Sequence, residues 1–272
     1  MDILSLIGFL LAIVLIVVSI ATGKNPETGD VQIVMEQLKG FFDPGSVAIV
    51  IGGTVGALLI SYPGNFFKKI PKHLKIVFFP TKYNPTEYIE QITEFAKEAR
   101  INGLLALEEK MNDIQDPFMK NALMLVVDSV EPEKVKVLLG NELDYLEDRH
   151  SQCQGFYMKM AEFAPAFGMA GTLIGLINLL ANMSDADALA SNMAVALVTT
   201  FYGVLVANLI GKPIANKLKK RHEEEMLCKV IISEGVQSIQ DGDNPQFIEE
   251  KLMRLLPTSL SSPDAKGGKK DK

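Results

Sequence analysis

Four stretches of this 272-residue chain, each longer than about 20 residues, contain no charged residue. They limit the folds that the chain can adopt. They cover residues 3–23, 44–67, 163–184 and 188–211. A helix of about 20 apolar residues crosses a hydrocarbon core about 30 Å thick, whereas buried helices of soluble proteins are rarely so long without a charge. We therefore predict an all-α membrane protein with four transmembrane helices. The first stretch follows Asp2 rather than a basic segment and is long for a signal peptide, so we expect it to be retained.

Basic residues gather beside two of these stretches. Those after the second are Lys68, Lys69, Lys72 and Lys75, and those after the fourth are Lys212, Lys217, Lys219, Lys220 and Arg221. The connection between the third and fourth stretches carries only Asp185 and Asp187 as charged residues. Because basic flanks favour the cytoplasm, we expect the segment between helices 2 and 3 and both chain termini to be cytoplasmic.

The alternation of apolar and polar segments predicts five parts in the chain. In the outer connection of the first part, Val31, Val34, Met35 and Leu38 recur at helical spacing, which predicts a short helix on the membrane surface. A polar end rich in Lys, Gly and Ser should be disordered. The five parts are residues 1–67 with transmembrane helices 1 and 2, 68–155 as a cytoplasmic helical domain, 156–211 with transmembrane helices 3 and 4, 212–257 as cytoplasmic C-terminal helices, and 258–272 as the disordered tail.

Prolines and glycines mark the expected helix ends in the cytoplasmic segments. Pro85 suits the first turn of a helix that ends near Arg100, because Asn102-Gly103 interrupts the pattern. Pro132 starts a helix that can continue into the third transmembrane helix without a break. Further helices are expected from about residue 104, and over 117–130, 213–240 and 245–256.

The sequence lacks the motifs of the common enzyme classes. It has no phosphate-binding loop, no dinucleotide-binding glycine pattern, no HExxH and no serine elbow. Cys153 and Cys228 have neither disulfide nor metal-ligand spacing, and the net charge of −6 gives no reason to expect a nucleic-acid partner. We therefore expect no enzyme activity, no metal site and no cofactor.

Three threonines lie inside the third and fourth apolar stretches. Thr172 lies about 13–14 Å above the inner edge of its helix, and Thr200, next to Thr199, lies about 16–17 Å above the same edge. Because the link between the helices is short, they should be antiparallel neighbours, and the three hydroxyls can meet where a permeating ion needs oxygen ligands. Alternatively, each hydroxyl bonds back to its own helix, and Pro165 is only a kink.

A carboxylate is missing from all four apolar stretches. A carrier or pump normally keeps an ionisable group in the membrane to bind and release its ion. The chain therefore offers hydroxyls and a kink without the titrating acid. That acid would have to come from a partner subunit.

Residues 196–213, ALVTTFYGVLVANLIGKP, resemble the signature of the flagellar motor stator A subunit (MotA/PomA) within the MotA/TolQ/ExbB channel family. The segment APAFGMAGTLIGL at 164–176 is similar to the third span of that family, and ARINGLLALEE at 99–109 is similar to its rotor-facing segment. The four-span layout matches as well, so the resemblance covers about residues 1–257.

The resemblance implies an ion-conducting stator subunit of the bacterial flagellar motor in the inner membrane. Five copies would surround two copies of a stator B subunit, whose single helix supplies an aspartate. Thr172, Thr199, Thr200 and Pro165 would line the ion pathway around that carboxylate, and Pro165 with Pro213 would couple ion binding to the cytoplasmic domain. Membrane lipid would be a further partner of the subunit.

On the cytoplasmic side, Arg100 and Glu108 match the family's charge pair that contacts the rotor switch protein. The transported ion would be H+ or Na+. We favour Na+, because Thr172 falls where sodium-driven relatives tend to carry a threonine, and a dehydrated sodium ion needs several oxygen ligands. Two alternatives stay open: a TolQ/ExbB-type energiser of envelope transport, and a passive membrane scaffold whose threonines only join helices.

Overall fold

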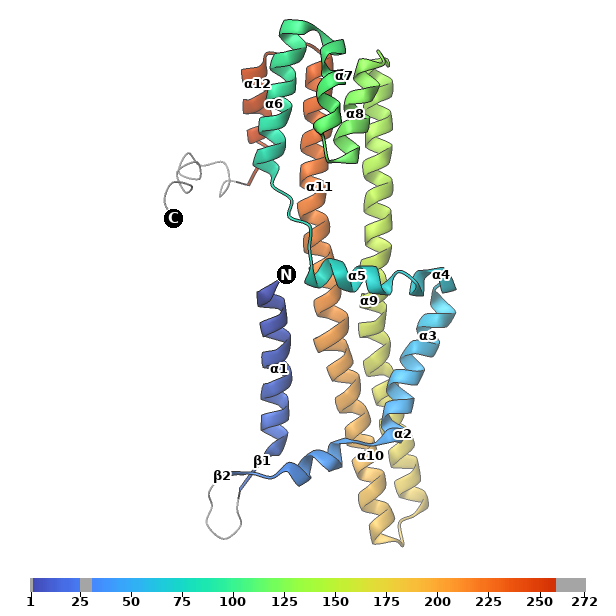
Figure 1. The fold of residues 1–272 in the computed structure, drawn as a ribbon. Helices are drawn as coiled ribbons and strands as arrows, with labels where there is room; N and C mark the ends of the chain where they lie inside the picture. The colour runs from blue at the N-terminus through green and yellow to red at the C-terminus, as the bar shows by residue number, and fades with distance from the viewer. Residues whose placement is uncertain (1, 25–30, 258–272) are drawn as a thin grey trace. The chain divides into compact units, whose positions relative to one another are not determined.

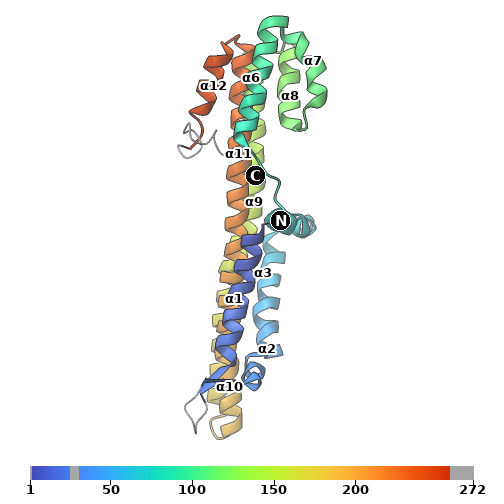
Figure 2. The same ribbon diagram turned by 60° about the vertical axis from the view of Figure 1, so that its left-hand side comes forward.

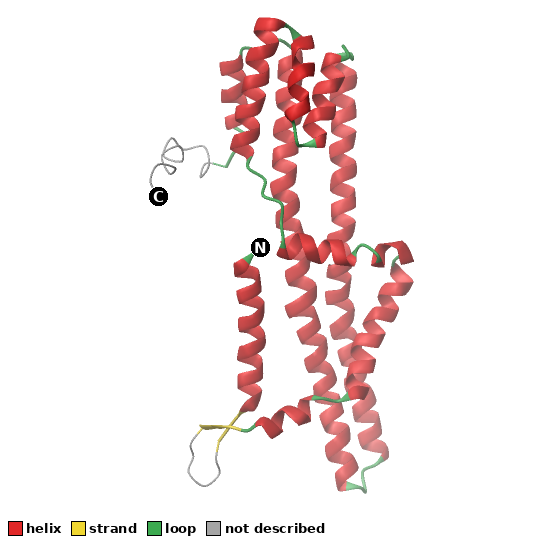
Figure 3. Ribbon diagram, viewed as in Figure 1, coloured by secondary structure: helices red, strands yellow, loops and turns green. Residues whose placement is uncertain are grey.

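The computed structural model describes residues 2–24 and 31–257 and is almost entirely helical (Figures 1 and 3). The predicted disordered tail, 258–272, lies outside the described residues. The chain divides into two compact units. Unit 1 comprises Met1–Thr81 and His150–Lys220, and unit 2 comprises Lys82–Arg149 and Arg221–Lys272. Each unit is described by itself below.

Four helical segments of the described chain are long and apolar enough to cross a membrane, as the sequence predicts. They are Ile3–Ala21, Pro44–Ser61, Pro132–Ala181 and Ala186–Gln240. The first is α1, and the third is the single helix α9, which begins at Pro132 as expected. The second consists of α2 (Pro44–Val47), the π-helical turn η2 (Ala48–Gly52) and α3 (Gly53–Ser61), and the fourth consists of α10 (Ala186–Leu205), the π-helical turn η5 (Val206–Gly211) and α11 (Lys212–Gln240).

The second span is shorter than its charge-free stretch, because the chain leaves the helix at Tyr62. This residue precedes Pro63 and adopts an extended backbone, with φ −130° and ψ 142°. A residue before proline is sterically kept out of the helical region, so the helix ends there. Two short helices follow, α4 (Gly64–Phe67) and α5 (Ile70–Phe78).

The outer connection differs from the predicted surface helix in its first residues. Val31–Ile33 forms strand β2, which pairs antiparallel with β1 (Thr22–Lys24), with Thr22 opposite Ile33. The helical spacing holds only later, where η1 (Met35–Phe41) is a 3₁₀ helix. The expectation of a helix from Val31 is therefore wrong over three residues, because the backbone of this segment pairs with Thr22–Lys24, a contact that local helical periodicity does not reveal.

Unit 2 is a helical bundle around one apolar core. It contains α6 (Pro85–Asn102), η3 (Leu104–Ala106), α7 (Leu107–Lys110), η4 (Met111–Asp113), α8 (Pro117–Val127) and α12 (Pro245–Met253), together with parts of α9 and α11. The predicted helices from Pro85, near 104, from 117 and from 245 are present, although α8 ends at Val127 and α12 at Met253. Gly103, at φ +84°, ends α6 as the sequence predicts, since glycine adopts this backbone region without a steric cost.

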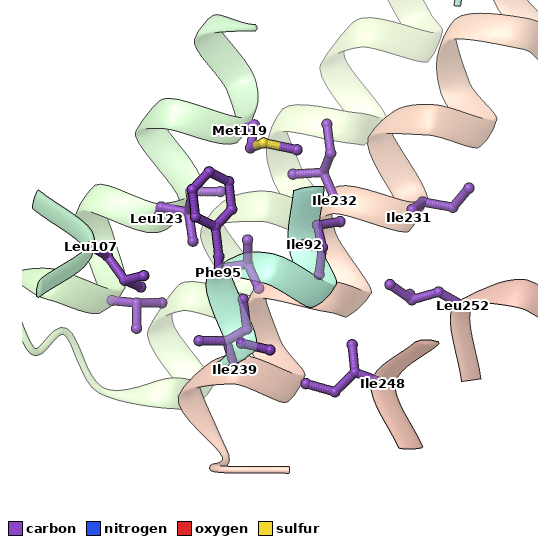
Figure 4. Packing of buried hydrophobic residues seen from close by; sticks show 14 of the residues in the cluster. Ile92, Phe95, Leu107, Met119, Leu123, Ile231, Ile232, Ile239, Ile248 and Leu252 are labelled. Carbon is purple, nitrogen blue, oxygen red and sulfur yellow. The ribbon is translucent and has the colours of Figure 1, made fainter. Parts of the chain in front are cut away.

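The core of unit 2 is filled by aliphatic side chains from different helices (Figure 4). Ile92 of α6, Leu123 of α8, Ile232 of α11 and Leu252 of α12 are fully buried. Burial of each such side chain contributes roughly 1.5–3 kcal/mol. Helices α6 and α11 approach closely at Gly235, where a Cβ would lie 2.6 Å from a methyl carbon of Ile92. Interdigitated aliphatic packing therefore holds this unit together.

Unit 1 has a second core at the end of the second span, made largely of aromatic rings. The rings of Phe66 and Phe156 lie 5.1 Å apart, and those of Tyr62 and Phe156 also lie 5.1 Å apart. We call this group, with Leu58, Val77, Tyr157, Ala215 and Leu218, the juxtamembrane cluster. It joins α3, α4 and α5 to α9 and α11 within unit 1.

Candidate functional site

The third and fourth spans cross through small residues, which bring their backbones together. A Cβ at Gly168 would lie 3.0 Å from the carbonyl oxygen of Thr199, and a Cβ at Gly203 would lie 2.7 Å from that of Ala164. Gly175 likewise faces Ala196, at 2.8 Å for a Cβ. Small residues let membrane helices associate through close backbone contact. The predicted antiparallel pairing of these helices therefore has a specific physical basis.

Two of the three predicted threonines meet at this crossing. The hydroxyl oxygens of Thr172 on α9 and Thr200 on α10 lie 2.5 Å apart, and Thr200 is exposed. The Thr172 hydroxyl also lies within hydrogen-bond distance of two carbonyl oxygens, at 3.0 Å from Ala196 and at 3.2 Å from Gly168. Thr172 is half-buried, so the pair presents an oxygen to the outside of the single chain mainly through Thr200, where a partner or an ion can reach it.

The third threonine, Thr199, has different surroundings. Its side chain is fully buried, and its hydroxyl donates to carbonyl oxygens of its own helix, at 2.9 Å to Val195 and 3.0 Å to Ala196. Its methyl group faces Gly171, where a Cβ would lie 2.5 Å away. Thr199 therefore fills the contact between the two helices, as the alternative of back-bonding predicts, and does not join the exposed pair.

One carbonyl oxygen connects all three hydroxyls. The carbonyl oxygen of Ala196 lies 3.0 Å from the hydroxyl oxygen of Thr172, 3.0 Å from that of Thr199 and 3.5 Å from that of Thr200. A carbonyl oxygen has two lone pairs, so it cannot accept fully from every donor at once. The Thr172 and Thr200 hydroxyls therefore share donors and acceptors, and oxygen lone pairs stay available for a further ligand.

The two predicted prolines both lie inside continuous helix. Pro165 is within α9, and its Cα lies 3.0 Å from where a Cβ at Gly203 would stand. Pro213 is the second residue of α11, directly after the π-helical turn η5. Proline has no N–H to donate and crowds the preceding turn, and π turns are a common way to accommodate such a disturbance. Both prolines therefore mark places of weakened backbone hydrogen bonding.

Carboxylates do not enter this crossing. In the described residues of the third and fourth apolar stretches, no Asp, Glu or His occurs. No group of three or more His, Cys, Asp or Glu side chains placed to hold a metal ion was found in residues 2–24 and 31–257. The threonine pair can therefore offer neutral oxygens to an ion but cannot by itself carry the countercharge.

The predicted charge pair lies at the connection between α6 and α7 of unit 2. Arg100 is in the last turn of α6 and Glu108 is in the first turn of α7, and both are exposed. Within the part of the chain that the structure describes, neither makes an ion pair, whereas nearby Lys110 binds Glu98 at 2.7 Å. Ile101, in the last turn of α6, is 78% exposed. Both charges are therefore free for a partner surface.

Sequence reasoning missed a polar contact inside the juxtamembrane cluster. The hydroxyl oxygen of Tyr157 lies 3.3 Å from Nδ1 of His73, and both side chains are buried. Burial, aided by Lys69 and His150, lowers the pKa of His73 below its ordinary value of 6.5. The aromatic residues at 62, 66, 67, 156 and 157 were the available signal, because rings gather where two spans reach the membrane edge.

Sequence reasoning also missed a buried ion pair in unit 2. The ammonium of Lys229 donates to Asp116 at 2.8 Å, and the hydroxyl of Tyr88 donates to the same carboxylate at 3.0 Å. Asp116 also caps α8 by accepting from the N–H groups of Phe118 and Met119. Burial opposes ionisation of this carboxyl group, but the hydrogen bond and the charge of Lys229 outweigh it and keep the pKa of Asp116 below its ordinary value. The group is structural, because every contact is internal.

Comparison with known proteins identifies the family. A sequence model described as the MotA/TolQ/ExbB proton channel family matches residues 110–229, which include α8, α9 and α10. The chain is 44% identical over 216 residues to Motility protein A of Borreliella burgdorferi, covering 79% of this chain and 83% of that protein. The chain belongs to the MotA/TolQ/ExbB proton channel family. The resemblance carried by residues 196–213 is thereby confirmed.

Two further known proteins extend the likeness. Chemotaxis protein PomA of Vibrio alginolyticus is 38% identical over 217 residues, covering 79% of this chain and 85% of that protein. The solved structure of the flagellar MotAB stator complex from Bacillus subtilis matches with a TM-score of 0.81 at 32% identity, covering 95% of this chain and 97% of the matched chain. The family description names a proton channel, and the four-span helical fold is shared over nearly the whole chain.

Proposed function

We propose that this chain is the ion-conducting A subunit of a bacterial flagellar stator, which couples H+ or Na+ flow to rotation and to torque on the rotor. The observation that carries the proposal is the match, over 95% of the chain, to a subunit of a solved flagellar MotAB stator complex. Relatives named Motility protein A and PomA support the same assignment.

The ion pathway is proposed to run past Thr172 and Thr200. These hydroxyls lie at mid-membrane depth, 2.5 Å apart, and they have no carboxylate beside them in the chain. The acid that binds and releases the ion therefore belongs to the partner, a B subunit whose aspartate reaches this level. Thr199 supports the pathway indirectly by holding α9 against α10.

The assembly that fits this pathway is a ring of five A subunits around two B subunits. Ion passage turns the ring around the B subunits, and unit 2 then presses on the rotor switch protein. The free charges of Arg100 and Glu108 are the proposed contacts, each meeting an opposite charge. The transmembrane potential supplies about 2.3 kcal/mol per charge per 100 mV, so no hydrolysis is needed.

The protein lies in the inner membrane. The orientation that fits the basic flanks places both termini and unit 2 in the cytoplasm. In unit 1, the carboxylate of Asp2 forms an ion pair with Lys217. The start of α1 and the start of α11 therefore reach the same side of the membrane. Labelling of single cysteines placed at the two ends in spheroplasts tests this orientation.

Deletion of the gene is the experiment that tests the function. Cells that lack the protein should assemble normal flagella but not rotate them, and a plasmid copy should restore swimming. A TolQ/ExbB-type energiser would instead leave swimming intact and impair envelope transport. A passive scaffold would restore no ion flux when it is reconstituted with its B subunit in vesicles under a membrane potential.

A further inference from the structure

Helix α5 lies across the direction of the neighbouring spans of unit 1, as two views show (Figures 1 and 2). Its C-terminal end is held at a defined depth, because the backbone N–H of Asp2 donates to the carbonyl oxygen of Phe78 at 2.9 Å. Asp2 is the N-cap of α1, whose apolar run begins at Ile3. Helix α5 therefore lies at the level where the apolar part of α1 begins, which is the edge of the hydrocarbon region.

One face of α5 is fixed to the protein. His73 and Val77 are 5% and 4% exposed, and both pack into the juxtamembrane cluster, where His73 faces Tyr157. This packing sets the rotation of α5 about its own axis. The remaining faces are consequently turned away from the protein core.

The outward faces of α5 combine basic and apolar side chains. Lys72 and Lys75 are exposed on the side opposite the buried face, and Lys68 is exposed just before the helix. Leu74 is 37% exposed, and Ile76, which lies about 160° away around the helix and on the side of the lysines, is 44% exposed. An amphipathic helix with this composition lies in the interfacial plane of a bilayer, with its apolar side chains among the acyl chains and its lysines at the headgroups.

The lysine charges of this face are not compensated by the protein. Lys68, Lys72 and Lys75 make no ion pair among the residues that the structure describes, and no acidic residue occurs between Asp43 and Glu87 in the sequence. Lys69 differs, because its ammonium lies 6.0 Å from the centre of the Phe66 ring. An uncompensated positive row at the headgroup level attracts anionic lipid.

We propose that α5 and the lysines around it form a binding surface for anionic phospholipids of the adjacent leaflet. Lys68, Lys72 and Lys75 contact the phosphates and other anionic headgroup atoms, while Leu74 lies against the upper acyl chains. This surface is separate from the ion pathway and from the Arg100–Glu108 pair. It does not depend on the motor function proposed above.

Native mass spectrometry of the full chain, purified in detergent with its co-purifying subunits, tests the proposal. The probe is an equal mixture of phosphatidylglycerol and phosphatidylcholine with identical acyl chains. The parent protein should retain phosphatidylglycerol in preference to phosphatidylcholine. In the triple variant Lys68→Gln, Lys72→Gln and Lys75→Gln, that preference should fall by roughly a hundredfold, since each of the three lysines at an anionic surface matters by about fivefold.

A matched control removes the same number of charges elsewhere. Lys97, Lys120 and Lys136 belong to unit 2, and their change to Gln should leave the lipid preference unchanged. A triple Lys→Arg variant of the α5 lysines keeps the charge and should keep the preference, which separates lost charge from lost folding. Equal retention of both lipids by the parent, an equal loss in the control, or displacement of the lipid by inorganic phosphate would each overturn the proposal.

Discussion

The hydroxyl oxygens of Thr172 and Thr200 lie 2.5 Å apart and join α9 to α10 at the middle of the membrane-crossing part of unit 1. If a sodium ion binds the partner's carboxylate beside this pair, it gains neutral oxygen ligands that a proton does not need. The side chain of Thr172 should therefore influence which ion drives rotation.

Swimming speed at fixed pH should rise with sodium concentration in the parent strain, and Thr172→Ala should abolish most of that dependence. The reason is the loss of one oxygen ligand while the carboxylate of the partner remains. Thr172→Ser keeps the oxygen and serves as the matched control. Speed that ignores sodium in the parent would exclude sodium as the coupling ion, and a normal sodium response in Thr172→Ala would remove this residue from the ion pathway.

Gly171→Ala should weaken the packing of α9 on α10 by about 1–3 kcal/mol, because inserted methyl groups in a tight contact force the backbone apart. The added Cβ would lie 2.5 Å from the Thr199 methyl carbon. Gly8→Ala in α1 is the control, since a Cβ there meets nothing within 4 Å. Thermal aggregation of the detergent-purified protein measures the difference. Equal melting temperatures for both variants would contradict the close contact.

Reversal of the charges at Arg100 and Glu108 should lower torque and leave assembly intact. Both side chains are exposed, so each substitution should change folding stability by no more than about 0.5 kcal/mol. Bead rotation on tethered flagella measures torque, and immunoblots of membranes measure abundance. Normal torque in the double variant Arg100→Glu with Glu108→Lys would exclude this pair from the rotor contact.

Lys229→Met should destabilise unit 2 by about 3 kcal/mol, because it leaves the buried carboxylate of Asp116 without its countercharge. The lowered pKa of Asp116 means that its ionised form stabilises the fold above the ordinary value of 3.8, and this contribution is lost as the pH falls through the folded pKa. Without Lys229 the loss should begin at higher pH. Calorimetry from pH 4 to pH 7 tests this, and Lys110→Met, at a solvent-exposed pair, should change the melting temperature much less.

The juxtamembrane cluster should loosen as the pH falls below 6.5. Because burial lowers the pKa of His73, the unfolded form takes up a proton before the folded form, so stability is complete above 6.5 and declines toward the folded pKa. His73→Phe should remove this dependence while filling the same space beside Tyr157. Limited proteolysis of the α4–α5 segment at pH 7.5 and pH 5.5 provides the measurement. Cleavage that rises equally in the parent and in His73→Phe would refute the assignment.

The sequence could predict the features that depend on local patterns. The long charge-free stretches predicted the four spans. Pro132 predicted the start of α9, and Gly103 predicted the end of α6. The sequence predicted that Thr199 and Thr200 both lie inside the fourth span, but it did not predict that their side chains have different surroundings. Adjacent helical residues point about 100° apart, so the two side chains could not both face one pathway, and this signal was already present in the sequence.

The remaining features depend on contacts between distant residues. Asp116 and Lys229 are 113 positions apart, and His73 and Tyr157 are 84 positions apart. No periodicity within either segment specifies such a partner. The strand at Val31–Ile33 was missed for a related reason, since it pairs with Thr22–Lys24 and this pairing outweighs the weak helical spacing.

The π-helical turn Val206–Gly211 just ahead of Pro213 places an extra residue inside an otherwise α-helical rod. In an α-helix each residue turns the chain by about 100° and advances it by about 1.5 Å. If the turn lost its extra residue and became α-helical, the helix that begins before Pro213 would rotate by about 100° around the helix axis. Because Thr200 precedes this turn, such a twist would reorient the helix that follows and leave the Thr172–Thr200 contact in place.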